Sequence, residues 1–307
     1  MKNLEFTQDN GIIGLMDGNG SNLETLNKKM PGVVKLIGTS NPKSKARKKA
    51  NAWKVPLVEM DFSAFEKEKG VNKGDFLKVI SGKKIHSKLT PQEVIQVRQE
   101  ACSEFSALIK KALKDNGINK KIPVFAAGFM AILSEDFVND WFILNVHPGD
   151  LTMDDGDKRI LSGGAWVPSK KALLAGHGNL YTSMHLMTPD LDAGPVFMRG
   201  YALPVDYDKI ELSNHEQLKK AAIAAQKALK YIGDHVVAGA TFLDLFKGNW
   251  AMKDGKLFYK FKGKWQEVPD GIVIEEHVEN NPDTPFKLDD AYVQKIIDGF
   301  YSTLLQE

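Results

Sequence analysis

The stretch GIIGLMDGNGSNLE at residues 11–24 decides the fold. Its apolar first part, from Gly11 to Met16, predicts a buried strand. The polar, glycine-containing middle predicts a tight loop, and the start at Ser21 is typical of a capped helix. The same order continues downstream, with a strand at 33–38, a helix at 43–52 and a strand at 56–58. Such alternation predicts a parallel sheet.

Later segments extend this pattern. Thr90-Pro91-Gln92-Glu93 is a strong helix start, because a threonine cap precedes proline at the first helical position and glutamate follows three residues on. Buried strands are expected at 123–127 and 142–146. These features predict an α/β fold with an open, mostly parallel twisted sheet and helices on both faces.

The C-terminal part has a different pattern of expected helices and strands. Its expected elements are an alanine-rich helix at 214–237, small hairpins at 250–265 and a helix near 288–305. No linker rich in Gly, Ser and Pro divides the chain. We therefore expect one α/β domain over 1–266 with an insertion near 61–87, followed by a C-terminal extension over 267–307.

Composition excludes several classes of protein. With 307 residues, 43% hydrophobic and 26% charged, the chain can bury a core and is not a disordered protein. Its net charge of +2 gives no overall field toward nucleic acid or an anionic bilayer, so neither is expected as a partner. The single cysteine, Cys102, excludes an internal disulfide. With no membrane-spanning apolar run and no secretion signal, a cytoplasmic location is expected.

The loop after the first strand is a candidate phosphate site. Its glycines allow backbone amides to turn inward, and the following helix directs its positive dipole end toward the same point. The residues concerned are Gly18, Asn19, Gly20, Ser21 and Asn22. Leu23 stands where a dinucleotide fingerprint needs a third glycine, and the Lys-Ser/Thr pair of a P-loop is missing. An ordinary turn is the alternative interpretation.

Two further places put polar residues at strand ends. Asn145 and His147 are two residues apart, so a strand directs both side chains to one face, where an amide donor and an imidazole suit a carbonyl oxygen that gains charge. The alternating segment 182–188 runs into an acidic loop that contains Asp190 and Asp192. A structural histidine and turn-forming aspartates are the alternatives. No metal is expected, since His147, His185 and these aspartates lack a metal-ligand spacing.

Four motifs, in this order, resemble the folate-dependent formyltransferase family, and within it most closely the enzymes that formylate glycinamide ribonucleotide. The motifs are Gly18-Asn19-Gly20-Ser21-Asn22-Leu23, Ala127-Gly128-Phe129-Met130-x-Ile132-Leu133-Ser134, Leu144-Asn145-Val146-His147-Pro148 and Leu191-Asp192-x-Gly194-Pro195-Val196. The resemblance covers roughly residues 10–266. It implies a Rossmann-like formyltransferase fold.

The resemblance also implies site residues and substrates. Asn145, His147 and Asp192 would be catalytic, and Asp192 would raise the pKa of His147. The glycine loop would hold the phosphate of the amine substrate, and 10-formyltetrahydrofolate would be the formyl donor. The implied folate-pocket residues are Phe129, Met130, Ile132, Leu133, Met187 and Asp190. The default acceptor is glycinamide ribonucleotide, in purine biosynthesis. Transfer to another amine, such as a nucleotide-linked amino sugar, hydrolysis of the formyl-folate and a catalytically silent folate-binding module are alternatives, and a homo-oligomer is left open.

Some positions depart from the family. Arginine is usual where Ala131 stands, and serine is usual where Gly149 stands. The segment 150–175, which the family uses to contact the acceptor, is different here, and both the insertion near 61–87 and the tail are additional. The acceptor is therefore the least determined part of the interpretation.

Overall fold

The computed structural model describes residues 2–80, 82–118, 122–156 and 159–305. Asp157 and Lys158, in the segment that departs from the family, lie outside the described residues. The chain forms two compact units, one of residues 9–143 and the other of residues 1–8 with 144–307. The domain boundaries expected from the sequence stay a prediction.

The unit 9–143 contains a parallel set of strands in the spatial order β5-β2-β3-β4. The strands are β2 (Ile12–Leu15), β3 (Val34–Thr39), β4 (Leu57–Glu59) and β5 (Val124–Ala126). Helices α1 (Ser21–Lys29) and α2 (Ala46–Trp53) connect the first three, as the strand-loop-helix pattern predicts. Strands β2, β3 and β5 are almost wholly buried, which explains their continuous apolar sequences.

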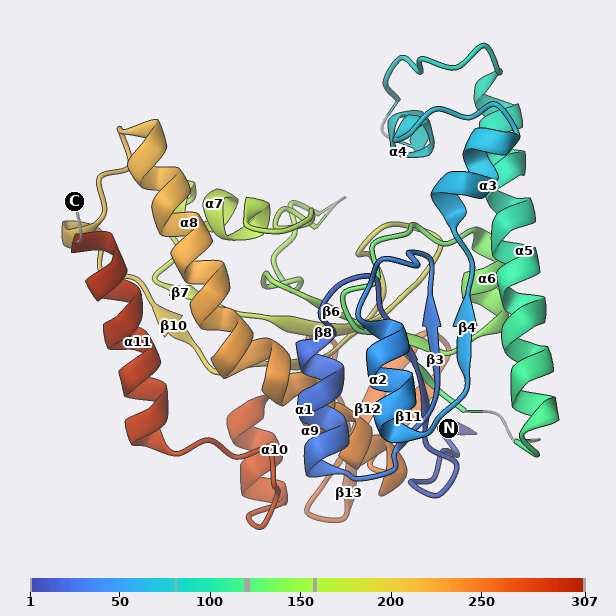
Figure 1. The fold of residues 1–307 in the computed structure, drawn as a ribbon. Helices are drawn as coiled ribbons and strands as arrows, with labels where there is room; N and C mark the ends of the chain where they lie inside the picture. The colour runs from blue at the N-terminus through green and yellow to red at the C-terminus, as the bar shows by residue number, and fades with distance from the viewer. Residues whose placement is uncertain (1, 81, 119–121, 157–158, 306–307) are drawn as a thin grey trace. The chain divides into compact units, whose positions relative to one another are not determined.

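Helix α5 (Pro91–Asp115) packs against β3 and β4, and in Figure 1 these strands lie between α2 and α5. Its expected capping box is present, because Thr90 Oγ1 accepts from the Glu93 amide at 3.3 Å and Glu93 accepts from the Thr90 amide at 2.6 Å. A short helix, α6 (Glu135–Asp140), begins at Ser134. The two faces of the parallel strands are thus covered by helices, as predicted.

The insertion near 61–87 folds into α3 (Phe62–Glu68) and α4 (Asp75–Ile80). Arg98 of α5 lies over the rings of Phe62 and Phe76, and its Nη1 donates to the carbonyl of Ile132 at 3.3 Å. Arg98 therefore links the insertion to the segment around Ile132, which the resemblance assigns to the folate pocket.

In the other unit, strands β6 (Ile143–His147), β8 (Ser183–Leu186), β9 (Val196–Arg199) and β14 (Ile272–Val273) lie in the order β14-β9-β8-β6. The β6–β8 and β8–β9 pairs are antiparallel, and β14 pairs with β9 in parallel. The sheet is therefore mostly parallel but mixed, with β8 as the reversed strand. Helix α7 (Val167–Leu174) and the short pair β7 (Asn179–Leu180) and β10 (Leu203–Pro204) belong to the same unit.

The alanine-rich segment after Asn214 is helical but longer than expected. It comprises α8 (His215–Leu229), a π-helical segment η2 (Lys230–Asp234) and α9 (His235–Phe246). A single 3-10 turn, η1 (Tyr207–Lys209), precedes it. The small alanines of α8 are buried and allow α7 and α11 (Asp290–Leu305) to pack closely against it, and Figure 1 shows α8 and α11 side by side.

The expected hairpins are β11 (Trp250–Lys253), β12 (Lys256–Phe261) and β13 (Lys264–Glu267), which with β1 (Lys2–Asn3) form an antiparallel sheet in the order β1-β11-β12-β13. Helix α10 (Ile274–Asn280) follows β14. Among the described helices, none combines the length and the apolar character needed to cross a bilayer.

Candidate active site

The antiparallel pairing of β6 with β8 assembles the centre of the site. Asn145 is directly opposite His185 in the register, and His147 lies two residues further along β6 on the same face. Asn145 Nδ2 is 3.2 Å from His185 Nε2, and the His147 and His185 ring centroids are 6.3 Å apart. The two strands thus bring a carboxamide and two imidazoles together.

Hydrogen-bond partners define which nitrogen carries the proton in the neutral rings of His147 and His185. His147 Nε2 lies 2.8 Å from the Leu161 carbonyl and His185 Nδ1 lies 3.1 Å from the Leu186 carbonyl. Because a carbonyl only accepts, each of these nitrogens carries the proton. In the neutral rings, His147 Nδ1 and His185 Nε2 are then acceptors, and His185 Nε2 accepts from the Asn145 amide.

Asp192 supplies the carboxylate of the group. Its Oδ2 is 3.6 Å from His147 Nδ1, and its Oδ1 is 3.9 Å from His185 Nε2. The Gly163 amide donates to Oδ2 at 3.3 Å. The backbone of Asp192 has a φ of +56°, in the left-handed region that aspartate tolerates better than most residues. Gly194 fixes the loop further, since a Cβ there would lie 1.9 Å from the Leu186 carbonyl oxygen.

The structure therefore brings together the three residues expected to be catalytic, Asn145, His147 and Asp192, and adds His185 to them. Their catalytic roles stay a prediction. Sequence reasoning considered His185 only as a metal ligand. The signal that could have found it is its position on the alternating segment that ends in the acidic loop, since a neighbouring strand would place it opposite Asn145.

Burial controls the charge of the two histidines. It lowers the pKa of His147, which is only 3% exposed, and outweighs the opposite effect of Asp192. Burial likewise lowers the pKa of His185 to about 4, against the effect of Asp192. Asp192 does act to raise the pKa of His147, as expected, but desolvation of the ring is the larger effect, so the net shift of this pKa is downward. Both rings are neutral near pH 7.

The departure at Gly149 has a steric explanation. A Cβ at this position would lie 2.8 Å from Pro168 Cβ, 3.0 Å from the Leu161 carbonyl oxygen and 3.2 Å from His147 Cδ2. The segment that carries Leu161 and Pro168 therefore comes close enough to hold His147 only because residue 149 has no side chain. The serine usual in the family would push this segment away.

The candidate phosphate loop lies in the unit 9–143. Gly18 and Asn19 are exposed, Ser21 is half-buried, and Gly20 and Asn22 are buried at the start of α1. Lys49 lies against Gly20 and forms an ion pair with Glu24. A cation beside a helix N-terminus increases the attraction for an anion. Lys49 could not be singled out from the sequence, because the basic run 43–49 that contains it is typical of a solvated helix face.

Asp17 organises the segment next to this loop. Its Oδ2 accepts from the Met130 amide at 2.8 Å and from the Ala131 amide at 3.3 Å, while its Oδ1 accepts from the Ser40 amide at 2.8 Å. One buried carboxylate thus joins the ends of β2 and β3 to the segment after β5. Sequence reasoning counted Asp17 only as a loop residue.

The candidate folate residues have different environments. Phe129 stacks on Phe105 with 6.0 Å between the ring centroids, and Leu133 is buried. Ile132 packs on an apolar cluster that includes Phe76 of the insertion and Val94 of α5. Met130 is 76% exposed. In the other unit, Met187 is half-buried and Asp190 is exposed. Among the described residues, no group of three or more His, Cys, Asp or Glu side chains is arranged to hold a metal ion.

Comparison with known proteins agrees with the fold. The phosphoribosylglycinamide formyltransferase from Coxiella burnetii has a TM-score of 0.54, is 19% identical, and aligns over 86% of this chain and 98% of its own. Glycinamide ribonucleotide transformylase 1 from Symbiobacterium toebii has a TM-score of 0.50, is 18% identical, and aligns over 80% of this chain and 92% of its own. No protein-family model matches the sequence, and no curated protein sequence matches it. The chain has the α/β fold of these transformylases, which confirms the predicted fold class.

Proposed function

We propose that this protein transfers the formyl group of 10-formyltetrahydrofolate to the primary amine of a small phosphorylated substrate, with glycinamide ribonucleotide as the default acceptor. The observation that carries the proposal is the group formed by Asn145, His147 and Asp192, in which the imidazole and the carboxylate are 3.6 Å apart. Such a reaction belongs to cytoplasmic one-carbon metabolism and, with the default acceptor, to purine biosynthesis.

Asn145 stabilises the charge that forms during attack. When the amine attacks the formyl carbon, the carbonyl oxygen becomes an oxyanion and needs preorganised donors. One hydrogen of the Asn145 amide is held by His185 Nε2 at 3.2 Å, which fixes the plane of the carboxamide and leaves the second hydrogen for the oxyanion. A donor of this kind lowers a barrier by about 2.7–4 kcal/mol.

His147 and Asp192 receive the proton of the attacking amine. After attack the nitrogen is an ammonium that must lose a proton before the folate leaves. Neutral His147 presents its unprotonated Nδ1 toward Asp192 Oδ2, and its other nitrogen is held by the Leu161 carbonyl. A proton arriving between Nδ1 and Oδ2, directly or through water, is shared by two acceptors that otherwise repel each other. The protonated ring then returns a proton to the leaving folate nitrogen.

Residues outside this group fit substrate binding. The loop Gly18 to Asn22, at the start of α1 and next to Lys49, suits the phosphate of the acceptor. The segments around Phe129 to Leu133 and from Met187 to Asp190 would contact the folate, as the resemblance implies. The amides of Met130 and Ala131 already donate to Asp17, so this carboxylate holds the first segment in shape for the folate.

The test is incubation of the full chain with 10-formyltetrahydrofolate and a panel of amines, with tetrahydrofolate release and product mass as readouts. Glycinamide ribonucleotide, its dephosphorylated nucleoside and a nucleotide-linked amino sugar separate acceptor identity from the need for phosphate. We expect tetrahydrofolate release only with a phosphorylated amine, together with a product heavier by one formyl group in place of a hydrogen.

Other outcomes would change the assignment. Tetrahydrofolate release without any amine would mean hydrolysis of the formyl-folate. Formylation of the amino sugar alone would retain the reaction and replace the default acceptor. No release with any amine, from protein that binds the folate, would leave a folate-binding module and overturn the proposal.

A further inference from the structure

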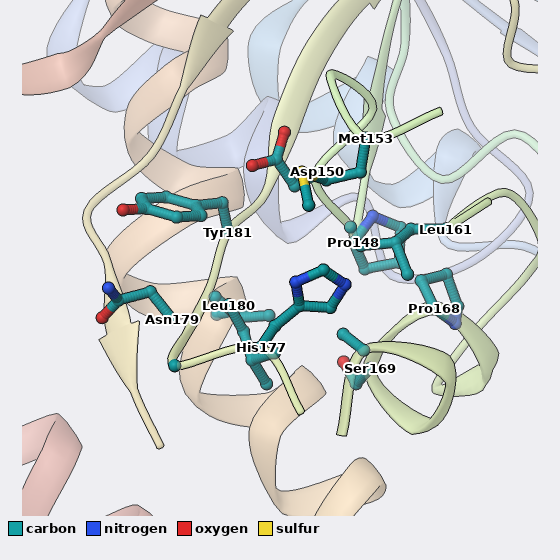
Figure 2. Close-up of a pocket in the computed structure, with 14 residues that line it drawn as sticks. Pro148, Asp150, Met153, Leu161, Pro168, Ser169, His177, Asn179, Leu180 and Tyr181 are labelled. Carbon is teal, nitrogen blue, oxygen red and sulfur yellow. The ribbon is translucent and has the colours of Figure 1, made fainter. Parts of the chain in front are cut away.

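A hollow lies beside the candidate active site and is not part of it. It has a volume of about 130 Å³, enough for a small ring system, and is bounded by the loop after β6, by α7 and by the segment that leads into β7. Figure 2 shows the imidazole of His177 in the middle of the labelled side chains, with Tyr181 and Asp150 on one side and Ser169 and Pro168 on the other. All of these residues belong to one unit.

The reacting group does not line this hollow. Asn145, His147, His185 and Asp192 are absent from its described lining residues. Leu161 separates the two places, because it lines the hollow while its carbonyl accepts from His147 Nε2 at 2.8 Å. A molecule in the hollow would therefore lie behind the wall that holds His147 and would not be attacked there.

Two polar atoms of the hollow have unused hydrogen-bonding capacity. Ser169 is 2% exposed, and its Oγ has no hydrogen-bond partner among the described residues. The same holds for the buried Nε2 of His177. Buried polar atoms without partners are costly, and they usually mark a place where a ligand or water completes the bonds. A hydroxyl and an imidazole nitrogen can each donate or accept, so together they suit a ligand that offers both a donor and an acceptor.

Charge and shape narrow the class of ligand. Among the described residues that line the hollow, no lysine or arginine is present, which disfavours an anion. Asp150 is already paired with Arg199 at 3.2 Å and accepts from Thr152 Oγ1 at 2.6 Å, which disfavours a cation. The remaining lining is mostly apolar. The planar rings of Tyr181 and His177 are among the lining side chains, and a flat ligand can stack on such rings.

We propose that this hollow binds a neutral, planar nitrogen heterocycle of about the size of a nucleobase, through hydrogen bonds to Ser169 Oγ and His177 Nε2. The site is independent of the formyl-transfer proposal, because neither Ser169 nor His177 has a role in that reaction.

The experiment compares two bicyclic probes of similar size. Benzimidazole, neutral above pH 7, has one nitrogen donor and one nitrogen acceptor, whereas indene has neither. Each is titrated into protein with ¹³C-labelled histidine, and the His177 ring signal is identified by its loss in His177→Gln. We expect saturable shifts of the His177 signal with benzimidazole, and at least tenfold weaker binding of indene.

Two matched variants test the role of the hydroxyl. Ser169→Ala removes the unpartnered group in the hollow, and Thr241→Val removes another buried hydroxyl that has no partner among the described residues and does not line the hollow. We expect Ser169→Ala to weaken benzimidazole binding about fivefold and Thr241→Val to leave it unchanged.

The proposal is overturned by equal affinity of the two probes, by benzimidazole binding that leaves the His177 signal in place, or by no binding up to the solubility of the probe. Unchanged affinity in folded Ser169→Ala also overturns it. If either variant fails to fold, the comparison of benzimidazole with indene on the unmodified protein still decides.

Discussion

Two aspartates of the unit that contains β6 and β8, Asp244 and Asp192, lie beside histidine side chains but in different surroundings. His277 Nδ1 is 2.6 Å from Asp244 Oδ2, and both side chains are fully buried. His147 Nδ1 is 3.6 Å from Asp192 Oδ2, at a carboxylate that is 10% exposed. The residue types are the same, and the difference lies in what surrounds each carboxylate.

Asp244 is saturated with donors. Besides His277, it accepts from Tyr259 at 2.9 Å, Asn249 at 2.8 Å and Asn281 at 3.2 Å, and His277 is held at its other nitrogen by Thr284 Oγ1 at 2.9 Å. Asp192, by contrast, has one backbone donor, at 3.3 Å, among the hydrogen bonds that the described residues show. A saturated carboxylate joins α9, β12 and α10, and an unsaturated one keeps capacity for a substrate proton.

The largest effect is expected for Asp244→Ala. Removing the carboxylate leaves several buried donors without a partner, which costs about 3–5 kcal/mol. Urea unfolding followed by circular dichroism should show this loss, while turnover per folded molecule changes little. Asp270→Ala, in an exposed turn, is the control and should change the free energy of unfolding by less than about 0.5 kcal/mol. A loss below about 1 kcal/mol for Asp244→Ala would remove the contrast between the two pairs.

The opposite behaviour is expected for His147→Ala and Asn145→Ala. Each should lower turnover at least about a hundredfold, equivalent to about 2.7–4 kcal/mol in the barrier, because the proton acceptor or the oxyanion donor is lost. The measurement is tetrahydrofolate release at saturating substrates, and urea unfolding on the same samples confirms that the protein is folded. Turnover within tenfold of the unmodified protein would discard the catalytic assignment.

Local sequence patterns predicted the parallel part of the fold well. The apolar runs at 11–16 and 33–38 are buried on both faces as β2 and β3, and the Thr90 cap starts α5 where expected. The direction of β8 could not be predicted, because alternation reports which face of a strand is buried and says nothing of its orientation. The π-helical segment between α8 and α9 also has no sequence signature of its own.

The site was predictable as far as local geometry determines it. Asn145 and His147 share a face because they are two residues apart in a strand. The contacts with Asp192 and His185 depend on the register of β6 with β8 and on a loop with a left-handed residue, both of which tertiary packing fixes. Burial lowers the pKa of His147 and Asp192 raises it, and the net direction depends on which effect is larger. No sequence pattern reports the relative size of these two effects.

The smallest effect concerns the pH dependence of stability. It tests whether protonation of the buried histidines beside Asp192 lowers the free energy of unfolding. Burial lowers the pKa of His185 to about 4, whereas an unfolded histidine titrates near 6.5. Between these pH values the unfolded chain binds more protons than the folded chain. The free energy of unfolding should therefore fall as pH decreases, by up to about 1.4 kcal/mol per pH unit, and recover above pH 6.5.

The test is urea unfolding between pH 7.5 and 5. His185→Gln should flatten this slope, while His215→Gln, at an exposed position, should not. The lowered pKa of His147 acts in the same direction, so a residual slope is expected in His185→Gln. Identical slopes in all three proteins would mean that the charge of His185 is accommodated in the folded state, and that burial does not keep this ring neutral.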